Sequence, residues 1–141
     1  MRLFLDTSVI LAACASPRGA SHAVFEHAAT QGWILVATSY VRSEVLNNLA
    51  NFPSAASTEW ARLRPQLIMM EDVVSLDRPV VFTASKDRPV LFSALAWAEV
   101  LLTLDRADFV GLLGDWFYEL RLLRPGQFIQ MERDAGRLPQ V

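Results

Sequence analysis

Hydrophobic residues in this chain form short continuous runs that alternate with stretches of helical periodicity. The apolar runs at 3–5, 33–38, 101–104 and 120–123 predict strands. Apolar residues spaced three and four apart predict helices at 9–15, 21–32, 40–52, 57–67, 87–98 and from 108 through Trp116 and Tyr118. Strands that are apolar throughout and alternate with helices are typical of an α/β fold, in which helices cover a parallel sheet.

Two parts of the chain have less regular patterns. Segment 68–86 contains only apolar fragments around Pro79, and we expect one short strand within it. The run 120–123 is expected to be an edge strand, closed by a turn at Pro125 and Gly126. Because the sequence is polar from Met131 onward, we expect residues 131–141 to form a tail that is frayed or ordered by a partner, beyond a domain at 1–130.

Composition limits the class of protein. The 141 residues are enough for one domain, and 52% of them are hydrophobic while 20% are charged, which excludes a disordered or fibrous chain. The net charge of −2 argues against binding nucleic acid by a broad basic surface, so any such contact has to be local.

The N-terminus and the cysteine content indicate the compartment. Residues 1–16 imitate a signal peptide, but Asp6 interrupts the apolar stretch, and no run approaches the length of a membrane-spanning helix. Cys14 is the single cysteine and cannot form an internal disulfide; we interpret it as a small buried hydrophobe. We therefore expect a soluble, cytoplasmic protein. His22 and His27 lie about 140° apart on their helix, so they cannot bind one ion together, and we expect both at the surface.

Aspartates directly follow two of the predicted strands. Asp6 comes after the first strand and Asp105 after the run at 101–104. In parallel sheets the carboxyl ends of the strands share one edge, where ligands bind. Glu44 lies about 60° from the apolar line of its helix, at the rim of the buried stripe, and Asp87 begins a later helix, with Asp108 as a fifth acid. We expect these acids to converge.

Converging carboxylates repel one another unless a cation neutralises them. An oxygen-only set without histidine or cysteine argues against zinc and favours a hard ion, Mg²⁺ in particular, which activates water and polarises phosphoryl oxygens. Hydroxyls that can assist are those of Thr7, Ser8 and Thr103. Basic side chains that can grip phosphate or neutralise the acids are those of Lys86, Arg88 and Arg106. The alternative roles are helix caps for Asp87 and Asp108 and a solvated helix acid for Glu44.

Four segments together resemble the successive motifs of PIN-domain nucleases. They are Leu5-Asp6-Thr7-Ser8, Ser43-Glu44-Val45, Lys86-Asp87-Arg88-Pro89-Val90-Leu91 with Ala94, and Leu102-Thr103-Leu104-Asp105-Arg106-Ala107-Asp108-Phe109. The stretch Leu123-Arg124-Pro125-Gly126-Gln127-Phe128-Ile129 is similar to the family's closing strand. The resemblance spans about residues 2–130. The sequence departs from the family at Leu104, where many members have glycine.

The resemblance implies a three-layer α/β/α domain with a mostly parallel sheet of about five strands. It implies Mg²⁺- or Mn²⁺-dependent endoribonuclease activity, with Asp6, Glu44, Asp87 and Asp105 as the catalytic acids and metal ligands and Asp108 as a further ligand. Many small bacterial members are toxins of toxin–antitoxin pairs, similar to the VapC group, so an antitoxin partner and a homodimer are expected. The apolar helices at 40–67 also favour a homodimer. The alternatives are an inactive PIN-like binding module and an α/β phosphatase.

Overall fold

The computed structural model describes residues 1–73, 88–105, 116–117 and 119–140. In chain order the elements are β1 (Arg2–Leu5), α1 (Thr7–Ala15), α2 (Ala20–Gln31), β2 (Ile34–Thr38), α3 (Ser39–Asn48), the 3₁₀ turn η1 (Leu49–Asn51), α4 (Ser54–Leu63), the 3₁₀ turn η2 (Arg64–Gln66), β3 (Leu67–Met70), α5 (Arg88–Trp97), β4 (Val100–Leu102), β5 (Trp116–Phe117), β6 (Leu120–Leu123) and α6 (Pro125–Asp134).

The strands form one sheet in the order β3-β2-β1-β4-β6-β5. The first five are parallel, and the two-residue β5 is antiparallel to β6 at the edge. Phe4 in β1 lies beside Val36 on one side and Leu101 on the other, and all three are buried. The predicted α/β fold with a mostly parallel sheet is therefore confirmed. β5 was not predicted, because a strand of two residues has no recognisable sequence pattern.

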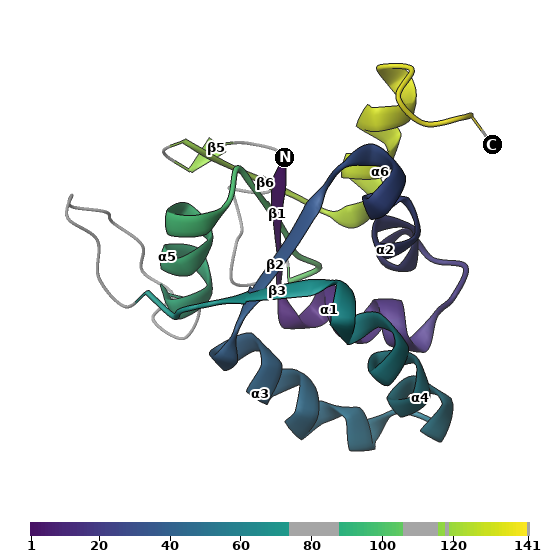
Figure 1. Ribbon diagram of the computed structural model, residues 1–141, viewed down its shortest axis with the longest axis vertical. Helices are drawn as coiled ribbons and strands as arrows, with labels where there is room; N and C mark the ends of the chain where they lie inside the picture. Colours follow the sequence, from purple (N-terminus) through teal and green to yellow (C-terminus); the bar gives the residue numbers. More distant parts are fainter. Residues whose placement is uncertain (74–87, 106–115, 118, 141) are drawn as a thin grey trace.

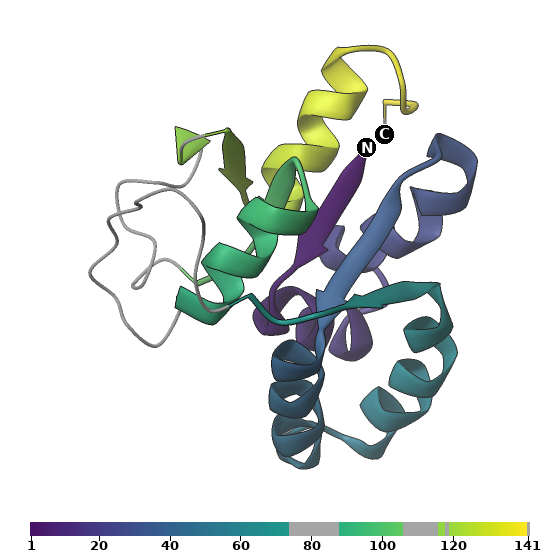
Figure 2. The same cartoon turned by 60° about the vertical axis from the view of Figure 1, so that its left-hand side comes forward.

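Helices cover both faces of this sheet. Figures 1 and 2 show α5 on one face, packed on β1 and β4, and α1, α2 and α6 on the opposite face. α3 and α4 extend past the carboxyl ends of the strands, where α4 packs against α1. Burial of both faces explains why the strands read as continuous apolar runs and not as alternating patterns.

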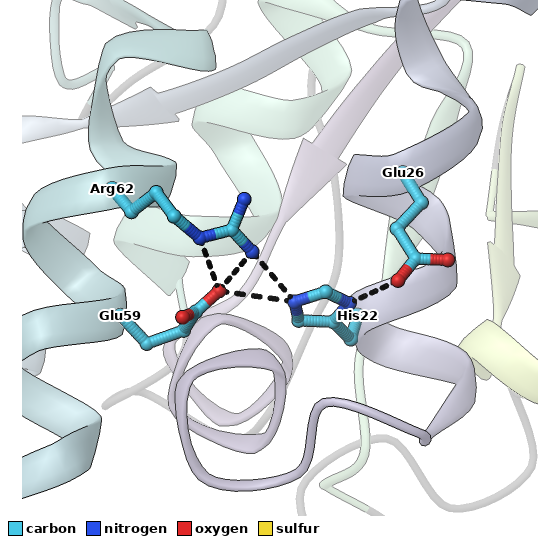
Figure 3. Close-up of polar contacts among 4 residues, drawn as sticks. All are labelled: His22, Glu26, Glu59 and Arg62. Atoms are coloured by element: carbon cyan, nitrogen blue, oxygen red, sulfur yellow. Dashed lines mark hydrogen bonds and ion pairs between the residues drawn. The ribbon is translucent and has the colours of Figure 1, made fainter.

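A polar network centred on the buried His22 joins α2 to α4 (Figure 3). His22 is buried; its Nδ1 lies 2.9 Å from Glu26 Oε1 and its Nε2 lies 3.1 Å from Glu59 Oε1. Arg62 pairs with Glu59, and its Nη2 lies 3.1 Å from His22 Nε2. The expectation that His22 is a surface residue is wrong, because the periodicity of one helix does not reveal which other helix packs over it.

The predictions for 57–86 need two corrections. α4 begins at Ser54 and ends at Leu63, because Pro65 lies in the turn that follows and the chain then enters β3. β3 overlaps the segment 68–86 in which one short strand was expected, but it begins at Leu67 and lies before the apolar fragments of that segment, and residues 74–86 lie outside the described residues.

The C-terminal part differs most from the sequence prediction. Pro125 and Gly126 do not form a turn, because Pro125 begins α6, where its missing N–H costs nothing. β6 is not an edge strand, and Trp116 lies in β5, so the helix expected from 108 cannot run through it. The rest of that predicted helix lies outside the described residues.

The expected frayed tail is also wrong for its first eight residues. Residues 131–134 are the last turn of α6, and Leu138 beyond it is only 5% exposed. Glu132 is buried and paired with Arg137. The polar composition of this segment did not indicate its packing. α6 holds the segment against the core through Phe128, whose ring centroid lies 4.9 Å from that of Trp33.

Cys14 is buried in α1, as expected for a small hydrophobe. Burial, with a smaller contribution from the charge of Glu59, raises the pKa of its thiol to about 11. None of the helices in the described ranges is long and apolar enough to cross a membrane.

Candidate functional site

Asp6 lies where β1 ends, at the carboxyl edge of the sheet. Its backbone N–H donates to the carbonyl of Leu102 over 3.0 Å, which extends the pairing of β1 with β4 by one residue. Its side chain N-caps α1: Oδ1 accepts a 2.8 Å bond from the N–H of Thr7. Oδ2 accepts bonds from the hydroxyls of Thr103 at 2.7 Å and Ser8 at 3.3 Å. Asp6 is only 7% exposed, and these three hydrogen bonds hold its side chain in one orientation.

Thr103 connects Asp6 to Asp105. Its hydroxyl, which is fully buried, donates to Asp6 and accepts a 3.0 Å bond from the N–H of Asp105. The two aspartates that follow separate strands therefore lie at the same edge of the sheet, as the sequence predicted. The hydroxyl of Ser8 strengthens the same connection, because it also accepts a bond from the N–H of Leu104 at 3.0 Å.

Glu44 reaches this edge from α3. It is half-buried, as its position at the rim of the apolar stripe predicts, and Oε1 accepts a 2.9 Å bond from the hydroxyl of Thr7. Thr7 thus contacts both acids, since its N–H is bonded to Asp6. The two carboxylates are close enough for the charge of Glu44 to act on Asp6.

The surroundings of Asp6 disfavour its ionised form. Burial raises the pKa of the carboxyl above its ordinary value, and the charge of Glu44 adds to the rise. Hydrogen bonds from Thr103, the N–H of Thr7 and Ser8 lower the pKa but only partly offset the effect of burial. A cation beside the two acids would reverse this balance, because it stabilises both negative charges.

The donor set at this edge fits a hard cation. Asp6 and Glu44 supply carboxylate oxygens, and Mg²⁺ is commonly held by one or two carboxylates together with waters and substrate phosphate. Within the described ranges, no three His, Cys, Asp or Glu side chains lie close enough together to hold a metal ion. Two further predicted ligands, Asp87 and Asp108, lie outside the described residues.

The remaining predicted site residues fall into two groups. Thr7, Ser8 and Thr103 use their hydroxyls to hold the acids in place. Lys86 and Arg106 lie outside the described residues, and Arg88 is described only as the first residue of α5.

Two polar residues at the same edge were missed by the sequence analysis. Continuing the register of β1 and β2 by two residues places Thr38 beside Asp6. Thr38 is fully buried, and its hydroxyl has no hydrogen-bond partner in the described part of the chain. Asp72, after β3, accepts a 3.1 Å bond from the N–H of Tyr40 and so caps α3. The position of Thr38 just before a predicted helix was the one available signal, because Ser and Thr favour helix N-caps.

A cavity of about 800 Å³ lies elsewhere, at the amino ends of the strands. Its lining includes Met1, Glu99, Val100 and Arg121 together with residues of α6. None of the predicted site residues lines it. The candidate site at the carboxyl edge of the sheet is therefore separate from this cavity.

The strand order β3-β2-β1-β4-β6, with helices on both faces, defines a PIN-like α/β fold. The structure is similar to a chain in the crystal structure of VapBC2 from Rickettsia felis bound to a DNA fragment from their promoter, with a TM-score of 0.56. The match covers 86% of this chain and 97% of that chain at 14% sequence identity, so it establishes a common fold. No protein-family model and no curated protein matches the sequence.

Proposed function

We propose that this protein is a metal-dependent endoribonuclease of the PIN type. The observation that carries the proposal is the buried carboxylate of Asp6, oriented by Thr103 and Ser8 next to Glu44 at the carboxyl edge of a parallel sheet. An acid that is buried beside a second acid is costly for the folded protein. Such arrangements are concentrated at functional sites, where a ligand offsets the cost.

Asp6, Glu44, Asp87 and Asp105 are the proposed ligands of Mg²⁺ or Mn²⁺, with Asp108 as a further one. The ion, when bound, supplies an activated water and charge stabilisation for hydrolysis of an RNA phosphodiester. Thr103 and Ser8 keep Asp6 in one rotamer, and Thr7 keeps Glu44 beside it. Lys86, Arg88 and Arg106 are proposed to bind the phosphates of the substrate.

The similarity to a chain of the VapBC2 complex also supports a biological setting. We propose that the protein acts in the cytoplasm as the toxin of a toxin–antitoxin pair and is held inactive by an antitoxin protein. We also propose that the protein forms a homodimer.

A second candidate is a PIN-like binding module without catalysis. It is favoured by one observation, the lack of three clustered metal-binding side chains among the described residues. In that case Asp6 would serve as the N-cap of α1 and Glu44 as its neighbour.

Cleavage of a fluorogenic RNA in Mn²⁺ tests the proposal. Asp6→Asn is expected to reduce the rate to below about 1% of wild type, since loss of a second-sphere group already costs ~10–100-fold. Asp134→Asn, on the exposed end of α6, is the matched control and should retain full activity.

Mn²⁺ binding separates the two candidates. In a thermal-shift titration, Mn²⁺ at a hundred times its Kd should stabilise the wild type by ~2.7 kcal/mol. Asp6→Asn should lose most of this stabilisation. If Mn²⁺ neither supported RNA cleavage by the wild type nor stabilised it, the binding module would be the better description.

A further inference from the structure

The cavity of about 800 Å³ at the amino ends of the strands has an apolar floor between the sheet and α6. Val100 of β4 and Leu123 of β6 line it from the sheet, and both are buried. α6 and its C-cap contribute residues spaced as i, i+3, i+4 and i+7, which places them on one helix face: Phe128, Met131, Glu132 and Ala135. The volume lies within the ~300–1,000 Å³ typical of sites for small molecules.

Acidic side chains outnumber basic ones around this floor. Four acids and two arginines line the cavity, which leaves a formal excess of −2: Glu99, Glu119, Glu132, Asp134, Arg121 and Arg137. Glu132 and Arg121 are the two of these that are not exposed, so the excess negative charge lies at the mouth. A positively charged ligand is attracted to such a mouth, and an anionic ligand is repelled.

The charges of Glu99 and Asp134 are not neutralised by their hydrogen bonds. Glu99 Oε2 accepts a 2.6 Å bond from the backbone N–H of Arg2, and Asp134 Oδ1 accepts a 2.8 Å bond from the side-chain amide of Gln130. Both donors are uncharged. These two acids can therefore balance the charge of a bound cation.

Glu132 is the buried acid of the cavity. It is only 3% exposed, and its Oε2 pairs with Nε of Arg137. No group in the described part of the chain donates a hydrogen bond to its other oxygen, Oε1. A buried carboxylate oxygen without a donor is costly for the folded protein. A donor on a ligand in the cavity would remove that cost.

We propose that this cavity binds a small organic cation, an amine that carries an apolar body. The body lies on Val100, Leu123 and Phe128, and the ammonium group donates a hydrogen bond to Oε1 of Glu132. Burial of apolar surface supplies affinity, and the charge-assisted bond together with the acidic mouth selects the cation. The site is separate from Asp6, so the proposal does not depend on nuclease activity.

The shape of the space favours an elongated body. A second hollow, of about 480 Å³, continues the cavity along α6 as far as Gly126, near the beginning of the helix. The two hollows share four lining residues: Arg121, Leu123, Met131 and Asp134. An apolar chain or a chain that ends in a ring can therefore extend from one hollow into the other.

Amide NMR titrations with phenylbutylamine, phenylbutanol and phenylbutyrate test the class of ligand, because the three probes share one apolar body and differ in charge. The amine is expected to bind with a Kd of about 1 mM, as a ligand of this size does, and to perturb the amides of Leu123, Met131 and Ala135. It should bind about tenfold more tightly than the alcohol, and the carboxylate should bind most weakly. Equal binding of amine and alcohol, or no saturable shift at ~10 mM amine, would overturn the proposal.

Surface variants separate the contributions of charge and space. Glu99→Gln combined with Asp134→Asn should abolish the preference for amine over alcohol but keep alcohol binding. Ala135→Trp fills the cavity from its exposed rim and should block both probes. Glu71→Gln is the matched control, because Glu71 is an exposed acid outside this cavity, and it should bind as wild type. A preference that persists in the folded double variant, or binding that persists in folded Ala135→Trp, contradicts the proposed site.

The role of Glu132 has its own test. Glu132→Gln should weaken amine binding about tenfold and leave alcohol binding unchanged, since the amide cannot make the charge-assisted bond. Circular dichroism checks the fold of each variant. If loss of the pair with Arg137 unfolds Glu132→Gln, the surface variants still decide the proposal. A folded Glu132→Gln that binds the amine as tightly as wild type would show that Glu132 does not hold the ammonium group.

Discussion

Replacing Thr103 with valine tests the physical account of the Asp6 site. Valine keeps the shape of the side chain but removes the hydroxyl that donates to Asp6 over 2.7 Å and accepts from the N–H of Asp105. Thr103 is fully buried, so water cannot easily replace the bond to Asp6. The variant is expected to be less stable than the wild type at neutral pH.

The size of the effect follows from the two lost bonds. A hydrogen bond to an ionised group contributes ~1.5–3 kcal/mol, and a bond between neutral groups contributes ~0.5–1.5 kcal/mol. Asp105 is only partly buried, so water can accept the hydrogen bond of its N–H after the change. We therefore expect Thr103→Val to lower the free energy of unfolding by about 1–3 kcal/mol in the absence of metal, with the larger values where Asp6 is ionised.

The effect should depend on pH. Because the folded pKa of Asp6 lies above its unfolded value, the folded state holds this proton more tightly, and metal-free stability declines as pH rises from about 4 through the folded pKa. The bond from Thr103 lowers that pKa, so its loss raises the pKa further and extends the decline to higher pH. The difference between variant and wild type should therefore grow with pH.

Urea unfolding of metal-free protein between pH 4 and pH 8 measures both quantities. Thr103→Ser is the control, because it keeps the hydroxyl and should keep the shape of the wild-type pH profile. If Thr103→Val differs from wild type by less than ~0.5 kcal/mol at pH 7 and follows the same pH profile, the hydroxyl does not stabilise the Asp6 carboxylate, and the reasoning is wrong.

Two further predictions concern buried polar groups. Thr38→Val removes a buried hydroxyl that has no partner among the described residues. Calorimetry should therefore show a melting temperature at or above that of the wild type. A drop of several degrees would mean that the hydroxyl is hydrogen-bonded. His22→Ala should destabilise the fold by about 2–3 kcal/mol in urea unfolding, because it leaves a cavity and breaks the link between α2 and α4 (Figure 3), whereas His27→Ala should cost less than ~1 kcal/mol.

Much of the fold could be predicted because its signals are local. Continuous apolar runs gave β1, β2, β4 and β6, and the helical spacing between them gave α1, α2 and α3 with errors of a few residues at their ends. β5 could not be predicted, since two residues show no period. α6 was missed because Pro125 and Gly126 are typical of turns, and a proline is equally suited to the first turn of a helix.

For the candidate site, the sequence alone determined which residues could act. The position of Asp6 and Asp105 follows from the continuous apolar runs that precede them, and the position of Glu44 at the rim of a helix follows from a period of 3.6 residues; both patterns are local. The tertiary structure decided what those residues experience. Thr103 bridges Asp6 and Asp105, burial raises the pKa of Asp6, His22 is enclosed by α4, and β3 is left at the edge. These features depend on which elements become neighbours across the sheet, and a chain's local pattern does not contain that information.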